Sequence, residues 1–124
     1  MLKDAVIQAM VTTTRPEASK KFYQETLGLT LLSEDQFGIQ FAGKIGFLRV
    51  AKAPGTLPAA HAVMNFMVDD AAASAKALAA KGVKLERFGF LQHDEDGLWS
   101  SPDGAKVGWF RDPDMNLIGL VQTP

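Results

Sequence analysis

The chain has 124 residues, 47% hydrophobic and 22% charged, and because typical domains have roughly 100–150 residues it has room for one compact domain. A formal net charge of −1 excludes the large positive surface that nucleic acid or an anionic membrane requires. There is no cysteine and there are two histidines, His61 and His93, so neither a disulfide nor a thiolate metal site can form. No apolar run approaches the roughly 20 residues that span a bilayer, and we expect a cytoplasmic protein.

The first half of the chain has the pattern of a strand, a helix and three further strands. Residues 5–13 read as the first strand. Thr14-Arg15-Pro16-Glu17 then has the pattern of a capping box, in which Thr14 and Glu17 satisfy free N–H groups at the start of a helix. Gly28 is expected to end that helix. The remaining strands are expected over residues 30–32, 36–41 and 44–50, the last two joined by Ala42-Gly43.

The second half repeats this order after a connector over residues 51–60, which contains prolines and a glycine. Residues 62–68 read as a strand, Asp69 or Asp70 caps an alanine-rich helix over 71–81, and Gly82 ends it. Further extended stretches are expected over residues 83–90, 98–101, 105–110 and 117–122. Short sequence matches at a constant separation, Ala18-Ser19 with Ala73-Ser74 and Lys21 with Lys76, also favour an internal duplication.

Three motifs occur in order along nearly the whole chain: ASKKFYQETLGL at 18–29, FMVDD at 66–70 and WFRDPDMNLI at 109–118. Together they resemble motifs of the vicinal oxygen chelate superfamily, also called the glyoxalase/bleomycin-resistance/extradiol-dioxygenase group. The resemblance implies an α+β fold in which two tandem βαβββ modules with curved mixed sheets form one cleft. It implies a single domain over 1–124, with module one at about 4–50 and module two at about 61–122. A second subunit often contributes contacts in this family, and we expect a homodimer.

The resemblance also implies where metal-dependent members hold their ion, namely at a histidine in the first strand of each module and a glutamate in the last. Gln8 and Val63 stand at the two histidine positions, Gly119 stands at the final glutamate position, and the fourth position falls near Gly46 or Leu48. Valine and glycine side chains supply no donor, whereas such an ion needs three or four. We therefore expect no metal, no cofactor and no catalytic residue, which weighs against an enzyme but leaves the question open.

Neither histidine falls at one of these ligand positions. His61 precedes Val63 by two residues, so alternation places it on the same side of the strand, and we interpret it as a solvated residue. His93 opens the run His93-Asp94-Glu95-Asp96, which we interpret as a solvated acidic turn and not as a cation site.

Strand alternation predicts which side chains face the cleft. Trp109 and Phe110 alternate, so only one of them can serve the core, and we place Phe110 inside and Trp109 in the cleft, where a planar ligand could stack. Trp99 is a second candidate wall, although both tryptophans could instead be core or dimer contacts. The expected ligand-binding residues are Gln8, Met10, Leu48, Val63, Asn65, Met67, Trp99, Trp109 and Gly119.

These features favour a metal-independent protein of the drug-resistance type, which sequesters an aromatic or amphipathic small molecule. The alternative is a glyoxalase-like lyase or dioxygenase with an atypical metal site built from His61 and displaced acids. A metal-free acid/base isomerase is a third hypothesis, but Glu34, Asp35 and Glu95, the carboxylates available for it, lie in loops where a solvated role is favoured.

Met115 replaces the glycine usual in the Asp-Pro-Asp-Gly-Asn turn of this family. Glycine tolerates a positive φ and methionine does not. We therefore predict either a changed turn type or local strain of about 1–2 kcal/mol.

Overall fold

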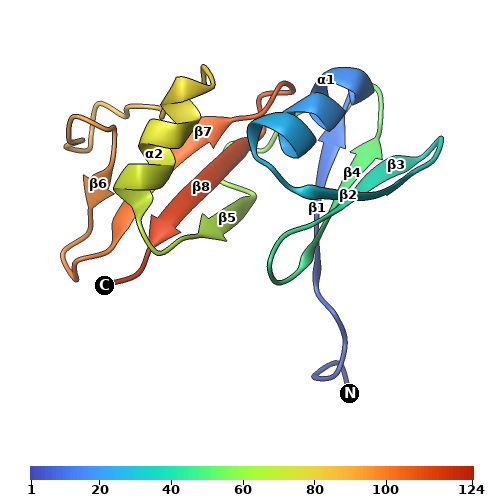
Figure 1. Ribbon diagram of the computed structural model, residues 1–124, viewed down its shortest axis with the longest axis horizontal. Helices are drawn as coiled ribbons and strands as arrows, with labels where there is room; N and C mark the ends of the chain where they lie inside the picture. Colours follow the sequence, from blue (N-terminus) through green and yellow to red (C-terminus); the bar gives the residue numbers. More distant parts are fainter. The chain divides into compact units, whose positions relative to one another are not determined.

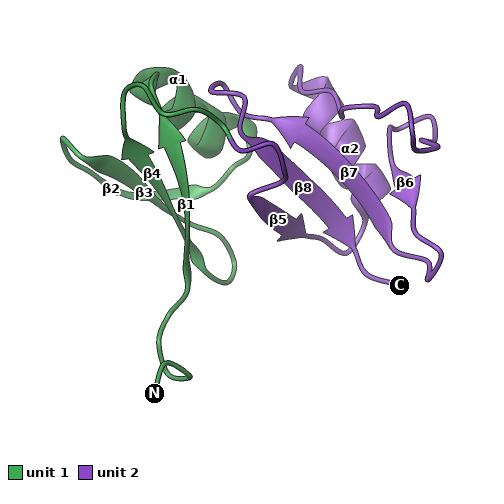
Figure 2. Cartoon of the chain, turned by 180° about the vertical axis from the view of Figure 1, so that it is seen from behind, with its two compact units in different colours: residues 1–58 green, residues 59–124 purple.

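The computed structural model describes residues 1–124. The chain divides into two compact units, residues 1–58 and residues 59–124 (Figure 2). Each unit combines a four-stranded mixed sheet with one helical segment, which confirms the predicted α+β class and the two βαβββ modules. Neither helical segment has the length and apolar character that spanning a membrane requires.

Unit 1 is a sheet whose buried face lies under a helical segment (Figure 1). The strand order is β1-β4-β3-β2, with β1 parallel to β4 and the other neighbours antiparallel. The Tyr23 ring is fully buried and lies 5.8 Å from the Phe41 ring on this face, so packing explains the one tyrosine. The elements are β1 (Gln8–Thr13), α1 (Pro16–Lys21), the π-helical segment η1 (Phe22–Thr26), β2 (Thr30–Glu34), β3 (Gly38–Ala42) and β4 (Phe47–Lys52).

The start of α1 differs from the predicted capping box. Arg15, not Thr14, is the N-cap residue, and its side chain makes no capping hydrogen bond. The residue before a proline avoids helical backbone, and Arg15 accordingly has φ −132° and ψ 71°. The Thr13 hydroxyl accepts the Arg15 N–H at 3.0 Å and lies 2.7 Å from the Ser19 hydroxyl, so a buried pair of hydroxyls joins β1 to the helix.

Unit 2 has the same architecture, with strand order β5-β8-β7-β6 and β5 parallel to β8. The identical order in the two units agrees with the predicted duplication. The Asp70 carboxylate accepts the Ala73 N–H at 3.0 Å and Gly82 has φ +86°, so both predicted ends of the helix are confirmed. The elements are β5 (Met64–Met67), α2 (Ala71–Ala80), β6 (Trp99–Ser100), β7 (Lys106–Arg111) and β8 (Leu117–Gln122).

The predicted extended stretch over residues 83–90 does not form a strand. It meets β7 at one point, where the Glu86 N–H donates to the Trp109 carbonyl oxygen at 2.7 Å. The other end of the same β7 edge is paired with β6, through Trp99 and Val107. The two segments therefore share one edge, and neither builds a long ladder on it.

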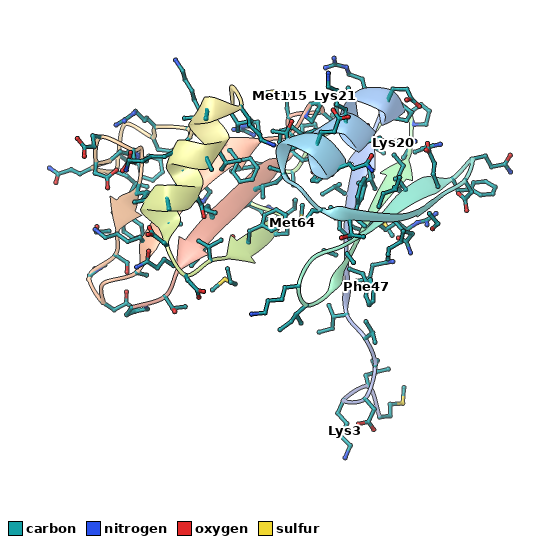
Figure 3. The ribbon with its side chains drawn as sticks, viewed as in Figure 1. Lys3, Lys20, Lys21, Phe47, Met64 and Met115 are labelled. Carbon is teal, nitrogen blue, oxygen red and sulfur yellow. The ribbon has the colours of Figure 1, made fainter.

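The turn between β7 and β8 keeps the backbone that glycine would adopt. Met115, labelled in Figure 3, lies in this turn. It has φ +69° and is the one non-glycine residue with a positive φ. Asp112 stabilises the turn, because its Oδ1 accepts the N–H groups of Asp114 and Asn116, both at 2.9 Å. Of the two predicted outcomes, the structure therefore has the strained backbone.

Candidate functional site

The sheet of unit 2 has one face against α2 and one open face. Phe110, Ile118 and Leu120 are at most 3% exposed, and α2 packs against β7 and β8. Residues directly opposite each other on paired strands share a face, so the register defines the open one. One row contains Asn65, Gly119 and Trp109, and the next contains Met67, Val121, Val107 and Trp99.

The open face carries an aromatic cluster. The Trp99 and Trp109 rings lie 6.4 Å apart with an interplanar angle of 32°. Phe88 meets Trp109 edge-on at 5.4 Å and 77°. Phe110 is buried on the other face, as predicted, and Trp109 lies on the opposite side of the strand.

His93 holds the loop beside this cluster. Its Nε2 accepts the Phe88 N–H at 2.9 Å, which places the ring proton on Nδ1, and Nδ1 donates to the Gly97 carbonyl oxygen at 2.8 Å. The ring lies 6.4 Å from Trp109 and is half-buried. Asp94 and Glu95 are exposed at the predicted acidic turn, whereas His93 itself is tied to two backbone groups that the sequence does not reveal.

The acidic residues after His93 are part of the same loop structure. The Asp94 Oδ1 accepts the N–H groups of Asp96 and Leu98, each at 2.9 Å. The Asp96 carboxylate forms an ion pair with Lys76 of α2 at 2.9 Å. These carboxylates fold the loop and tie it to the helix.

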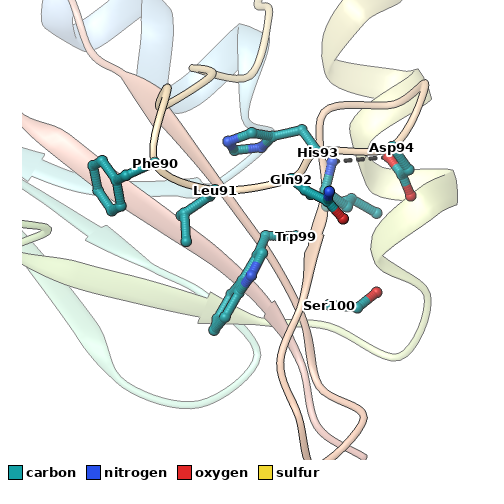
Figure 4. A pocket seen from close by; sticks show the side chains of 8 residues that line it. Phe90, Leu91, Gln92, His93, Asp94, Trp99 and Ser100 are labelled. Carbon is teal, nitrogen blue, oxygen red and sulfur yellow. Dashed lines mark hydrogen bonds between the residues drawn. The ribbon is translucent and has the colours of Figure 1, made fainter.

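A pocket of about 530 Å³ lies between this loop and β6 (Figure 4). In the close view Phe90, Leu91 and Trp99 lie on one side of the pocket, whereas Asp94 and Ser100 lie on the other. Phe90 is 83% exposed, so an aromatic ring lies open to solvent at the rim. The lining residues are Phe90, Leu91, Gln92, His93, Asp94, Leu98, Trp99 and Ser100. Trp99 was predicted as a ligand-binding residue, but the loop residues that line this pocket with it were not. The aromatic residues and the histidine of the loop were a usable signal in the sequence.

Asn65 and Gly119 are directly opposite each other on β5 and β8. A Cβ atom built on Gly119 would overlap the Asn65 Oδ1, so the amide lies over the glycine. Val63 extends the pairing of β5 with β8 by one residue, since its N–H donates to the Leu117 carbonyl oxygen at 2.9 Å. By alternation, Val63 lies on the same face as Asn65 and Met67. The six residues predicted from the second module thus lie on one face of unit 2.

Of the three residues predicted from the first module, two lie on the open face of unit 1. Gln8 and Met10 are exposed, and the Gln8 Nε2 donates to the Gln40 Oε1 at 3.0 Å. The prediction for Leu48 is wrong: it is 5% exposed and pairs with Phe41 on the face that packs against the helix.

The residues that replace Leu48 on the open face of unit 1 are its neighbours, Phe47 and Arg49. Phe47 pairs with Gln8 and Arg49 pairs with Met10. Sequence reasoning missed both because three consecutive residues of this strand, Phe47, Leu48 and Arg49, give no clear alternation.

The residues at the family's ligand positions do not fit a metal ion. Gln8 offers one neutral amide oxygen, Val63 offers no donor, and the space above Gly119 is taken by the Asn65 amide. The structure has no group of three or more His, Cys, Asp or Glu side chains that could hold a metal ion. His61, two residues before Val63, is exposed.

The carboxylates considered for acid/base chemistry have structural partners. Glu34 forms ion pairs with Lys20 and Lys52, each at 2.9 Å. The hydrogen bonds from Lys20 and Lys52 hold the pKa of Glu34 below its ordinary value. Hydrogen bonds from two backbone N–H groups likewise hold the pKa of the Asp35 carboxyl down. Both groups stay ionised near neutral pH, which suits ion pairing at the end of β2 and the turn after it, and not proton transfer. Glu34 therefore ends a strand and does not lie in the predicted loop.

Similar solved structures share this fold over the full length. TnmS3, an antibiotic binding protein from Streptomyces sp. CB03234, has 27% identity and a TM-score of 0.77, covering 100% of this chain and 99% of that one. A superfamily member from Sphaerobacter thermophilus has 20% identity and a TM-score of 0.79, covering 98% and 99%. Lactoylglutathione lyase from Agrobacterium tumefaciens has 16% identity and a TM-score of 0.74, covering 96% and 93%.

The search of curated proteins found no match. The family model described as Glyoxalase/Bleomycin resistance protein/Dioxygenase superfamily matches residues 5–120. That match covers nearly the whole chain and both βαβββ units. The chain therefore belongs to the glyoxalase/bleomycin resistance protein/dioxygenase superfamily.

Proposed function

We propose that this protein binds a planar aromatic small molecule, without a metal ion, by stacking it on the Trp99 and Trp109 face of unit 2. The observation that carries the proposal is that the chain has two tryptophans and that both lie on the open face with their rings 6.4 Å apart. Large aromatic side chains are normally buried in a core. Their place on an open sheet face is typical of a binding surface.

The energetics of this face suit a flat ligand. Stacking of a planar ring on an aromatic side chain contributes about 1–3 kcal/mol. Met67, in the row of Trp99, is 60% exposed, and its flexible thioether can adapt to different ring systems. The neighbouring pocket of about 530 Å³ falls within the usual range for small-molecule sites, about 300–1,000 Å³.

The similarity to TnmS3, described as an antibiotic binding protein, supports the same class of activity here. Sequestration of an aromatic or amphipathic antibiotic in the cytoplasm would confer resistance without chemistry on the drug. We include a homodimer in the proposal, because the family resemblance of the motifs implies it.

The competing hypothesis is a lyase or dioxygenase with an atypical metal site. The lactoylglutathione lyase similarity, at 16% identity, supports the fold and not the activity. The donors that such a site needs are replaced by Val63 and Gly119, and His61 is a single exposed imidazole. The geometry therefore favours binding.

Fluorescence titration tests the proposal directly, because the chain has two tryptophans and both lie on the proposed face. We expect planar polycyclic antibiotics or metabolites to quench this emission with saturation. Replacement Trp109→Ala should weaken binding about 10- to 100-fold, read from the remaining Trp99, whereas Trp109→Phe keeps a stacking ring and should lose much less. Phe37→Ala removes an exposed aromatic ring of unit 1 and serves as the control. A Trp109→Ala variant that binds as well as the wild type would refute the stacking role.

Elemental analysis separates this proposal from the metal hypothesis. Protein purified without chelator should hold no stoichiometric metal, and its melting temperature should not rise with Ni²⁺, Zn²⁺, Mn²⁺ or Fe²⁺. A stoichiometric ion together with a rise in melting temperature would support the enzyme instead.

A further inference from the structure

Asn65 is the polar side chain in the central row of the open face of unit 2. Val63 and Met67, the nearest residues on the same face of its strand, are both apolar. Two other polar side chains near this face are already paired: Arg111 Nε lies 3.1 Å from Glu86 Oε1, and both ring nitrogens of His93 bond to backbone atoms. The Asn65 amide is exposed and has no hydrogen-bond partner within the protein.

Gly119 decides where this amide lies. Its φ is not positive, unlike that of six other glycines in the chain, so its backbone would accept any residue. The Asn65 Oδ1 occupies the space of a Cβ atom, so this placement of the amide, and not the fold, depends on glycine. Because this oxygen is the end of an exposed, flexible side chain, a methyl group at 119 would push the amide off the sheet at little cost in stability.

The row of Asn65, Gly119 and Trp109 also determines the distance between the Asn65 amide and the Trp109 ring. Asn65 and Trp109 lie on β5 and β7, with β8 between them, and strand spacing separates them by about 10 Å. A ligand with two or three fused rings that stacks on Trp109 therefore reaches Asn65 with its edge. An asparagine amide offers a donor beside an acceptor, and it pairs best with an edge that offers the same two groups.

We propose that the Asn65 amide, held flat by Gly119, is the polar anchor of this site and selects planar ligands whose edge carries an N–H beside a C=O, as in a lactam or imide. The inference rests on the proposed function, since it needs a ligand stacked on Trp109. Asn65 is the residue that bonds to the ligand. Gly119 is a positioning residue that acts through Asn65.

Two matched probes test the selection of the ligand edge. Phenanthridinone is a flat tricyclic lactam with an N–H beside its C=O, and N-methylphenanthridinone has the same ring with the N–H blocked. Calorimetric titration of the wild type should give about 10- to 100-fold tighter binding of the unblocked lactam. Asn65→Ala should bring the two affinities within about threefold of each other by weakening only the unblocked lactam.

Gly119→Ala tests the positioning role without removing the amide. It should lose the preference as fully as Asn65→Ala does, with an unchanged melting temperature, and the double variant should lose no more than either single one. Gly43→Ala is the matched control, since a methyl group there meets only the Ile45 carbonyl oxygen at an ordinary 3.9 Å. It should keep the full preference.

The outcomes separate this inference from the proposed function. If both lactams bind the wild type equally and Trp109→Ala weakens both, the stacking site stands and the role of Asn65 is refuted. If Asn65→Ala loses the preference while Gly119→Ala keeps it, the positioning role of Gly119 is refuted. If no planar probe binds at all, the proposed function fails and this inference fails with it.

Discussion

Replacing Met115 with glycine should stabilise the protein relative to replacing it with alanine, because this position has a left-handed backbone with φ +69°. Both variants remove the half-exposed side chain beyond Cβ, so its contacts cancel in the comparison. Both also keep the two hydrogen bonds that the backbone of residue 115 makes, from its N–H to the Asp112 carbonyl at 2.9 Å and to its carbonyl from the Arg111 side-chain Nη1 at 3.1 Å. The difference between the variants therefore isolates the backbone.

The magnitude follows from two opposing terms. A left-handed conformation costs an L-residue about 1–2 kcal/mol. Glycine avoids this cost but gives the unfolded chain more freedom, which removes about 0.4–1 kcal/mol of the gain. The midpoints of these two ranges leave an expected advantage of glycine over alanine of about 0.8 kcal/mol, or a melting temperature higher by about 2–5 °C.

Urea unfolding followed by circular dichroism measures this difference, with the slope of the transition checked for equality between the two variants. The opposite result, an alanine variant as stable as the glycine variant, would show that the turn relaxes to a negative φ when the methionine is removed. The strain inferred from the backbone would then be absent.

Two further predictions concern groups whose structural role the sequence did not reveal. His93→Ala removes two hydrogen bonds to backbone groups and should lower the free energy of unfolding by about 1–3 kcal/mol, whereas the exposed His61→Ala should change it by less than about 0.5 kcal/mol; equal losses in urea unfolding would contradict the assigned role. Glu34→Gln tests the pH dependence that follows from the lowered pKa of Glu34, which is caused first by its hydrogen bond from Lys20. A lowered pKa means that the carboxylate stabilises the fold above the ordinary glutamate value of about 4.3 and that this contribution is lost as the pH falls through the folded-state value. The wild type should therefore unfold at higher urea than Glu34→Gln at pH 7, and the two should converge in acid; a gap that persists at the lowest pH would show that the ion pairs are not its cause.

The helix ends could be predicted from the sequence because local residues determine them. An aspartate at position 70 and a glycine at position 82 act through their own backbone neighbours, so no distant part of the chain is needed to recognise them. The same reasoning placed the first cap one residue too early, because Pro16 forces Arg15 out of helical backbone and makes it the N-cap. Motif order then supplied the fold class.

The candidate site could be predicted where alternation was clear and not where it was ambiguous. Asn65, between two apolar residues, had one consistent assignment, and the register agrees with it. Trp109 next to Phe110 was a choice between two large apolar residues, and the burial of Phe110 decides it. Phe47 and Leu48 are both large and apolar, so the sequence pattern cannot say which one is buried. Pairing with Phe41 buries Leu48, and that pairing depends on a strand elsewhere in the chain.

The two faces of the unit 2 sheet differ in how strongly a substitution affects the stability of the fold. On the face toward α2, Phe110 and Ile118 are at most 1% exposed, so a change there removes packing and costs several kcal/mol, roughly 2–5 for a large apolar residue cut to alanine. On the open face, Asn65 and Met67 are exposed, and substitutions at such positions usually change stability by less than about 0.5 kcal/mol. Val63 and Gly119, at two of the positions where the family resemblance implies metal ligands, lie on this second face. At such positions a valine and a glycine are compatible with the fold, and β5, β6 and β7 carry Asn65, Trp99 and Trp109 on the same face.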